Sequence, residues 1–194
     1  MYPPPIVLAS TSPYRRDLLA RLRLRFEVRA PTMNEAALPG EAARETALRL
    51  AQAKARAVAP DCPAALIIGC DQVAVLDGVS LGKPGDHANA VAQLRAMRGR
   101  SVLFHTALAL FNARTGALQT AEVPTTVRFR QYGDAEIERY LEAERPYDCA
   151  GSARIEGLGI VLVESVESTD PTALIGLPLI QLAAMLRNEG VAVV

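Results

Sequence analysis

Apolar runs of strand length alternate with helical patterns along most of this chain, and that alternation limits the folds open to it. Strands are predicted at residues 6–9, 24–29, 64–70, 73–76, 101–112, 117–130 and 160–164. Helices are predicted at 13–21, 41–59, 87–98, 135–143 and 178–189. The order is typical of a mixed α/β protein, and 194 residues suit a single domain spanning 1–194.

Local signals mark several ends of these elements. Ser12 followed by Pro13 is a good start for a helix, and Asp86 and Asp134 are placed to cap two later helices. Asp77-Gly78 between apolar residues predicts a tight hairpin.

Composition excludes several classes of function. The formal net charge is zero, whereas a general nucleic-acid binder usually carries a basic excess. No apolar run approaches the roughly 20 residues that a membrane helix needs, and the N-terminus lacks the pattern of a signal peptide. The three cysteines are odd in number and lack metal-ligand spacing, so we expect buried small residues rather than a Cys62–Cys70 redox pair. A cytoplasmic protein fits best.

With no basic excess, an anionic ligand would have to be held by cations that cluster locally. Of the 21 basic residues only Lys54 and Lys83 are lysines, in a sequence that otherwise uses arginine. A lysine kept against that bias is a candidate for a site that needs a compact ammonium group. Lys83 lies in a Gly82-Lys83-Pro84 turn that lacks the spacing of a Walker loop.

Two arginines are placed against the usual electrostatics of a helix. Arg15 and Arg16 fall in the first turn, where the positive end of the helix dipole makes each cation unfavourable by about 0.3–1 kcal/mol. An anion bound there by backbone N–H groups, the Ser10 and Ser12 hydroxyls and both guanidinium groups would remove the conflict. The alternative is a solvated, arginine-rich helix.

Two further residues depart from their surroundings. Lys54 shares the apolar stripe of its predicted helix, so it either reaches past the stripe into solvent, which is the commoner case, or meets an anion. Asp71 is expected where the apolar strand 64–70 ends, a position from which α/β folds present ligand-binding groups. A carboxylate there could hold a metal ion or accept a proton from water; the alternative is an ordinary turn residue.

Taken together, these segments resemble the Maf family of nucleotide pyrophosphatases. The resemblance covers nearly the whole chain in matching order and spacing. The matching segments are 8–16, Asn34-Glu35, Gln52-Ala53-Lys54-Ala55, Gly69-Cys70-Asp71-Gln72, Gly82-Lys83-Pro84, 150–157 and 176–179.

The resemblance implies an α/β fold with a mixed twisted sheet and flanking helices, in an elongated, two-lobed Maf/ITPase-like architecture with a central cleft, often dimeric. Members hydrolyse the α–β anhydride of nucleoside triphosphates to a monophosphate and pyrophosphate with a divalent metal, Mg²⁺ or Mn²⁺. Asp71 falls on the catalytic carboxylate and Glu35 on an acidic position near the metal. The phosphate-binding positions correspond to Ser12, Arg15, Arg16, Lys54 and Lys83.

The resemblance also indicates which nucleotide base the substrate carries. Gln72 and Glu156 match the branch that prefers 7-methyl-GTP, whereas Tyr14 stands where that branch usually has Trp, and Ala153-Arg154 replaces its usual Phe-Lys. A 7-methylated purine is positively charged, which favours an aromatic face and a carboxylate. A dTTP or UTP pyrophosphatase and a regulatory binding protein of septum formation are the alternatives.

Overall fold

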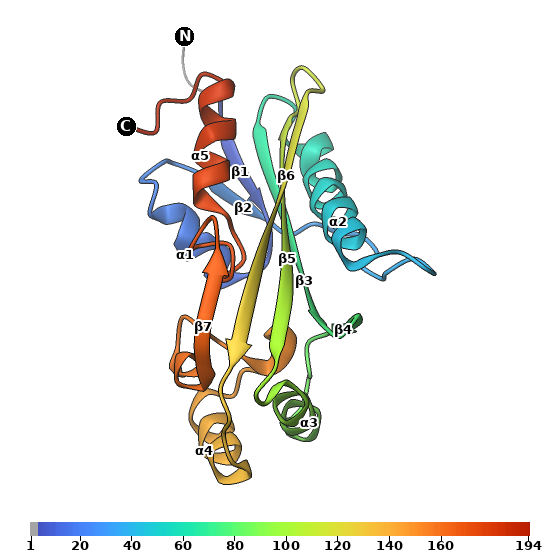
Figure 1. The fold of residues 1–194 in the computed structure, drawn as a ribbon. Coiled ribbons are helices and arrows are strands. Elements are labelled where there is room, and N and C mark those ends of the chain that lie inside the picture. The colour runs from blue at the N-terminus through green and yellow to red at the C-terminus, as the bar shows by residue number, and fades with distance from the viewer. Residues whose placement is uncertain (1–3) are drawn as a thin grey trace. The chain divides into compact units, whose positions relative to one another are not determined.

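The computed structural model describes residues 4–194 and confirms a mixed α/β fold within them (Figure 1). The strands are β1 (Ile6–Ala9), β2 (Glu27–Arg29), β3 (Leu66–Leu76), β4 (Val79–Leu81), β5 (Ser101–Asn112), β6 (Leu118–Phe129) and β7 (Val163–Ser168). The α-helices are α1 (Pro13–Ala20), α2 (Ala43–Val58), α3 (His87–Met97), α4 (Asp134–Glu144) and α5 (Leu179–Asn188). Short 3₁₀ turns are η1 (Ala59–Asp61), η2 (Ala150–Ser152) and η3 (Leu158–Leu162).

The strands form a sheet in the order β2-β1-β3-β5-β6-β7, with β4 paired to β3. Strand β1 is parallel to both β2 and β3, whereas β4 pairs antiparallel with β3 and β7 antiparallel with β6. The sheet is therefore mixed, as the family resemblance implies.

The chain divides into two compact units, each built from separate stretches of sequence. The first unit contains the described residues up to 71 together with 106–123 and 170–194. The second unit contains 72–105 and 124–169. Strands β3, β5 and β6 each contribute residues to both units.

In the first unit, helices cover both faces of the sheet (Figure 1). Successive side chains of a strand point to opposite faces, and β1 is buried on both. Ile6 and Leu8 join a core cluster with leucines of α1 and α5, whereas Val7 and Ala9 pack with Ala55 and Val58 of α2. This arrangement explains why β1 is an unbroken apolar run rather than an alternating one.

Gly69 lets β3 lie directly against the backbone of α2. A Cβ atom at this position would stand 2.0 Å from the Ala51 carbonyl oxygen and 2.8 Å from the Ala55 nitrogen. No side chain fits in that space, so only glycine allows the contact. The close approach fixes the part of α2 that carries Lys54 next to the part of β3 that carries Asp71.

We therefore expect Gly69→Ala to lower the free energy of unfolding by about 1–3 kcal/mol, because the atoms it meets belong to backbone and cannot rotate away. Urea titration measures this change. The control is Gly82→Ala, since a Cβ atom at Gly82 meets nothing within 4 Å. Equal stability of Gly69→Ala and the wild type would show that α2 can move back without cost.

In the second unit, α3 and α4 pack together around Tyr132 and Asp134. The Tyr132 hydroxyl donates a hydrogen bond to the Leu94 carbonyl at 2.8 Å, and the Asp134 carboxylate pairs with Arg95 and Arg98. These contacts join the end of α3 to the start of α4.

The structure confirms several of the predicted helix starts and the predicted hairpin turn. The Ser12 hydroxyl accepts the Arg15 N–H at the start of α1, and Asp86 accepts the Asn89 N–H at the start of α3. Asp77 and Gly78 both have positive φ, 47° and 81°, and join β3 to β4 as a tight hairpin.

Three predictions are wrong. Asp71 does not end a strand, because β3 continues through it to Leu76. Asp134 is the first residue of α4, and the residue before the helix is Gly133, whose N–H is accepted by Glu136. The run 160–164 is mostly the 3₁₀ turn η3, and the last strand, β7, begins at Val163.

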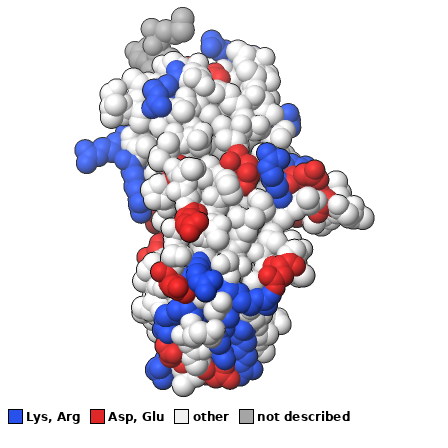
Figure 2. Space-filling view, viewed as in Figure 1, with Lys and Arg blue, Asp and Glu red and all other residues white. Residues whose placement is uncertain are grey.

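The expectation that the cysteines are buried is confirmed for Cys70 only, because Cys62 and Cys149 are partly exposed. On the face in Figure 2, acidic side chains lie among the basic ones. Within residues 4–194, no helix combines the length and apolar character required to cross a bilayer. None of the three cysteines forms a disulfide bond, and burial raises the pKa of the Cys70 thiol to about 11.

Candidate functional site

The turn between β1 and α1 gathers two serine hydroxyls at a helix N-terminus. Ser10 is buried, and its Oγ accepts the Ser12 N–H at 3.1 Å. The Ser12 Oγ in turn accepts the Arg15 N–H at 3.4 Å. An oxygen that accepts a hydrogen bond keeps its own hydrogen for donation. With the positive end of the helix dipole, this turn is suited to an anion such as a phosphate group.

Arg15 is held at this turn by backbone carbonyls. Its Nε donates to the Gly176 oxygen at 2.9 Å, and its Nη1 donates to the Cys70 oxygen at 2.8 Å. The Cys70 thiol also donates to the Gly176 oxygen, at 2.8 Å. These contacts offset the unfavourable position of Arg15 at the helix start, and they fasten its guanidinium group beside the residue that precedes Asp71.

Arg16 differs from its neighbour. Its guanidinium group is exposed and pairs with Asp17 of the same turn at 3.0 Å. The alternative of a solvated helix start therefore applies to Arg16 only, and anion binding at this turn stays a prediction. Arg16 behaves as a solvated arginine, and Arg15 is bound in place.

Lys54 lies between two carboxylates, and this cluster is the centre of the candidate site. Its Nζ is 2.7 Å from Asp71 Oδ1 and 2.6 Å from Glu35 Oε2. The Lys54 and Asp71 side chains are only 7% and 10% exposed, whereas Glu35, on the loop before α2, is 53% exposed. Of the two predicted alternatives for Lys54, the structure shows the contact with anions.

The same two carboxylates suit a divalent cation. Glu35 and Asp71 already converge on one positive charge, the Lys54 ammonium group. Mg²⁺ is usually held by one or two carboxylates and takes its other ligands from water and substrate phosphates. Among residues 4–194, no set of three or more His, Cys, Asp and Glu side chains is arranged to hold a metal ion. Glu35 and Asp71 are thus the residues at this site that could hold a divalent cation.

Three further predicted site residues, Gln72, Lys83 and Glu156, belong to the second unit. Gln72 follows Asp71 in β3, and Lys83 is exposed in the turn after β4. The Glu156 side chain is 22% exposed and lies 3.7 Å from the Arg154 Nε. Burial raises the pKa of the Glu156 carboxyl group, although Arg154 acts in the opposite direction.

The structure thus brings together Glu35, Lys54 and Asp71, which come from three separate segments of the sequence. It also ties Arg15 to the backbone next to Asp71. Tyr14 lies in the first turn of α1 and is partly buried.

Comparison with known proteins agrees with these features. The family model described as Maf-like protein matches residues 5–189. A protein of Methylobacillus flagellatus named 7-methyl-GTP pyrophosphatase is 60% identical over 191 residues, covering 98% of this chain and 100% of the relative. Proteins with the same name from Thiobacillus denitrificans and Ralstonia nicotianae are each 60% identical, covering 98% and 95% of this chain and 94% and 95% of the relatives. The chain belongs to the Maf family.

Proposed function

We propose that the protein hydrolyses the α–β phosphoanhydride of a nucleoside triphosphate, with 7-methyl-GTP as the preferred substrate, to give the monophosphate and pyrophosphate. The observation that best supports this reaction is the position of the Lys54 ammonium group between the Glu35 and Asp71 carboxylates. The names of relatives that are 60% identical over nearly the full chain support the choice of base.

We assign to Asp71 the role of orienting and deprotonating the attacking water. Lys54 donates to Asp71 Oδ1, so the carboxylate is held in one orientation and Oδ2 can accept a hydrogen bond from water. A carboxylate held in this way can orient the water and take its proton as the bond to phosphorus forms. Burial of both side chains keeps the pair in a medium where charge interactions are stronger than in bulk water.

The phosphate groups need positive charge and hydrogen-bond donors, because negative charge spreads over their oxygens during transfer. We assign this role to the start of α1, where the Ser10 and Ser12 hydroxyls lie with Arg15 and Arg16. The resemblance adds Lys83 to this set.

Glu35 and Asp71 are the residues that would hold a divalent cation, Mg²⁺ or Mn²⁺. When bound, such a cation neutralises charge on the phosphate oxygens and orients them. Both carboxylates also contact Lys54, which limits how far either can move from that position.

Recognition of the base is assigned to Tyr14, Gln72 and Glu156, as the resemblance implies. A cationic 7-methylguanine would favour the ionised form of Glu156, whose pKa is raised by burial in the absence of that charge. Tyr14 supplies an aromatic ring.

A panel of 7-methyl-GTP, GTP, dTTP and UTP tests the proposal, with Mg²⁺ present and both products identified. We expect pyrophosphate and a monophosphate, with the highest kcat/KM for 7-methyl-GTP. Release of orthophosphate and a diphosphate would contradict the assigned bond. Preference for dTTP or UTP would agree with the proposed reaction but would contradict the proposed preference for 7-methylguanine.

A further inference from the structure

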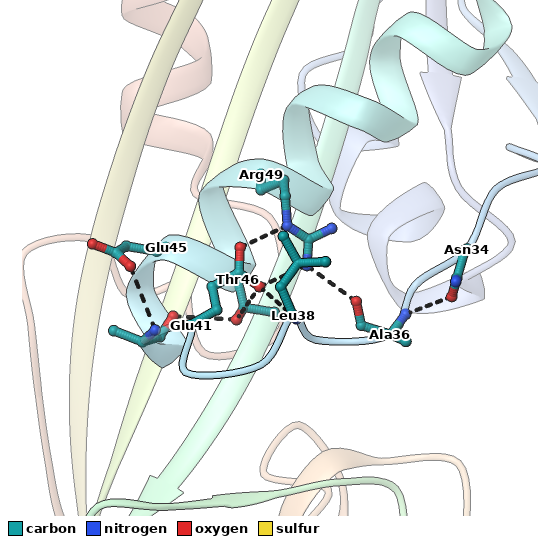
Figure 3. Close-up of polar contacts among 8 residues, drawn as sticks. Asn34, Ala36, Leu38, Glu41, Glu45, Thr46 and Arg49 are labelled. Atoms are coloured by element: carbon teal, nitrogen blue, oxygen red, sulfur yellow. Dashed lines mark hydrogen bonds and ion pairs between the residues drawn. The ribbon is translucent and has the colours of Figure 1, made fainter.

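Besides the Glu35–Lys54 ion pair, the loop that carries Glu35 is attached to α2 through the Ala36 carbonyl and Arg49 (Figure 3). Arg49 donates from Nε to Glu41 Oε1 at 2.6 Å and from Nη2 to Glu41 Oε2 at 2.7 Å. The same Nη2 donates to the Ala36 carbonyl at 3.1 Å. Arg49 therefore joins α2 to both ends of the segment 36–41, and Ala36 directly follows Glu35.

Glu41 fastens the middle of this segment as well. Its Oε2 accepts the Leu38 N–H at 3.1 Å and the Thr46 hydroxyl at 2.9 Å (Figure 3). The Glu41 side chain is only 10% exposed and that of Arg49 is 30% exposed. Two parallel hydrogen bonds between a guanidinium group and a carboxylate fix geometry as well as adding energy. The hydrogen bond from Arg49 is the main cause that lowers the pKa of Glu41 to about 2, so the pair is ionised at neutral pH.

The loop needs this second attachment because its contact with Lys54 is weak on its own. The Glu35 side chain is 53% exposed. Solvent around Glu35 screens this ion pair, and exposed pairs contribute only about 0–1 kcal/mol. Asn34 adds a local turn, since its Oδ1 accepts the Ala36 N–H at 2.9 Å (Figure 3). Glu35 is thus held between the Asn34 turn and the Ala36 carbonyl.

We propose that Glu41 and Arg49 are positioning residues that hold the Glu35 carboxylate beside Lys54 and Asp71. The inference rests on the proposed function, in which Glu35 and Asp71 receive the divalent cation with the substrate. Neither residue touches the reacting atoms; each acts through the loop that carries Glu35.

The test compares Glu41→Gln, Arg49→Met and Arg49→Lys with the wild type. Arg49→Lys keeps the charge but loses the fork that contacts Glu41 and Ala36 together. The matched control is Arg56→Met on the same helix, an exposed arginine whose guanidinium group donates to the Gln52 side chain. Three quantities are measured: amide hydrogen exchange over 34–41, binding of Mn²⁺ alone without nucleotide, and the Mg²⁺ concentration that gives half-maximal activity.

We expect Arg49→Met and Glu41→Gln to speed exchange over 34–41 by about tenfold, a change equivalent to about 1.4 kcal/mol. We expect Mn²⁺ affinity to fall and the Mg²⁺ requirement to rise by similar factors, with kcat at saturating Mg²⁺ changed much less. Arg49→Lys should be intermediate, and Arg56→Met should match the wild type. Because the change is confined to the loop, exchange in β1 and β3 should stay unchanged.

Unchanged exchange over 34–41 would overturn the inference, as would faster exchange with unaltered Mn²⁺ affinity and Mg²⁺ requirement. A uniform loss of kcat with no shift in the Mg²⁺ requirement would also overturn it, because that pattern indicates general damage. Failure of the proposed function is a separate outcome, in which the wild type hydrolyses none of the triphosphates. Exchange and Mn²⁺ binding do not depend on turnover, so they still report on the loop in that event.

Discussion

Replacing Asp71 with Asn is expected to lower kcat by about 10²–10⁴-fold and to leave nucleotide binding largely intact. An amide has nearly the shape of the carboxylate, and its oxygen can still accept the hydrogen bond from Lys54. It cannot take a proton from water, and it carries no charge to place beside a cation. Pyrophosphate release measures turnover, and calorimetry measures binding.

The matched control is Asp61→Asn, at an exposed aspartate after α2, which should retain wild-type rates. Wild-type rates in Asp71→Asn would remove Asp71 from the reaction. The same variant addresses the regulatory alternative in cells, since a septum phenotype unchanged by Asp71→Asn would favour a role in binding over one in catalysis.

Lys54→Met is expected to lower the free energy of unfolding by about 3–5 kcal/mol, because it leaves the buried Asp71 carboxylate without its partner. The contact with the exposed Glu35 adds little to this figure, since exposed pairs contribute about 0–1 kcal/mol. Methionine fills a similar volume, so lost packing is a small part of the effect. Urea titration measures the change.

Two comparisons make this prediction specific. Lys83→Met, at an exposed lysine, should change stability by less than about 0.5 kcal/mol. The double variant Lys54→Met/Asp71→Asn should recover much of the loss, because it removes the uncompensated charge. No recovery would mean that Lys54 stabilises the protein through contacts other than its pair with Asp71.

Elements with strong local signals could be predicted from the sequence. The strand 6–9 matches β1, the Ser12 hydroxyl starts α1, and Asp77-Gly78 forms the hairpin. Each depends on interactions within a few residues, or on an apolar run that only a buried strand explains.

The wrong predictions lie where distant parts of the chain decide the local structure. Asp71 follows the apolar run 64–70 and is predicted to end the strand, but its carboxylate is paired with Lys54 and the strand continues. The run 160–164 has the composition of a strand, yet most of it is a 3₁₀ turn with Ile160 and Val161 exposed. Short apolar runs cannot be assigned from periodicity alone.

In the candidate site, too, some residues can be predicted from the sequence and others cannot. The scarcity of lysine drew attention to Lys54, whose two carboxylate contacts the structure then shows. Asp71 stands out as a carboxylate directly after an apolar run, whereas the position of Glu35 comes only from the family resemblance. Arg49 was missed, because its partner Glu41 lies outside the helix and the bond to the Ala36 carbonyl involves backbone, which leaves no pattern in the sequence. The divalent cation and a homodimer stay predictions.

The position of Asp71 inside β3 restricts the insertions and deletions that the sequence tolerates near it. A carboxylate on a loop can be moved by lengthening or shortening that loop, but Asp71 lies in a strand hydrogen-bonded to neighbours in the sheet. Inserting or deleting one residue near it would turn the following side chains to the opposite face. We therefore expect relatives to differ around this position by substitution alone, and to place their differences in length in connections such as 113–117.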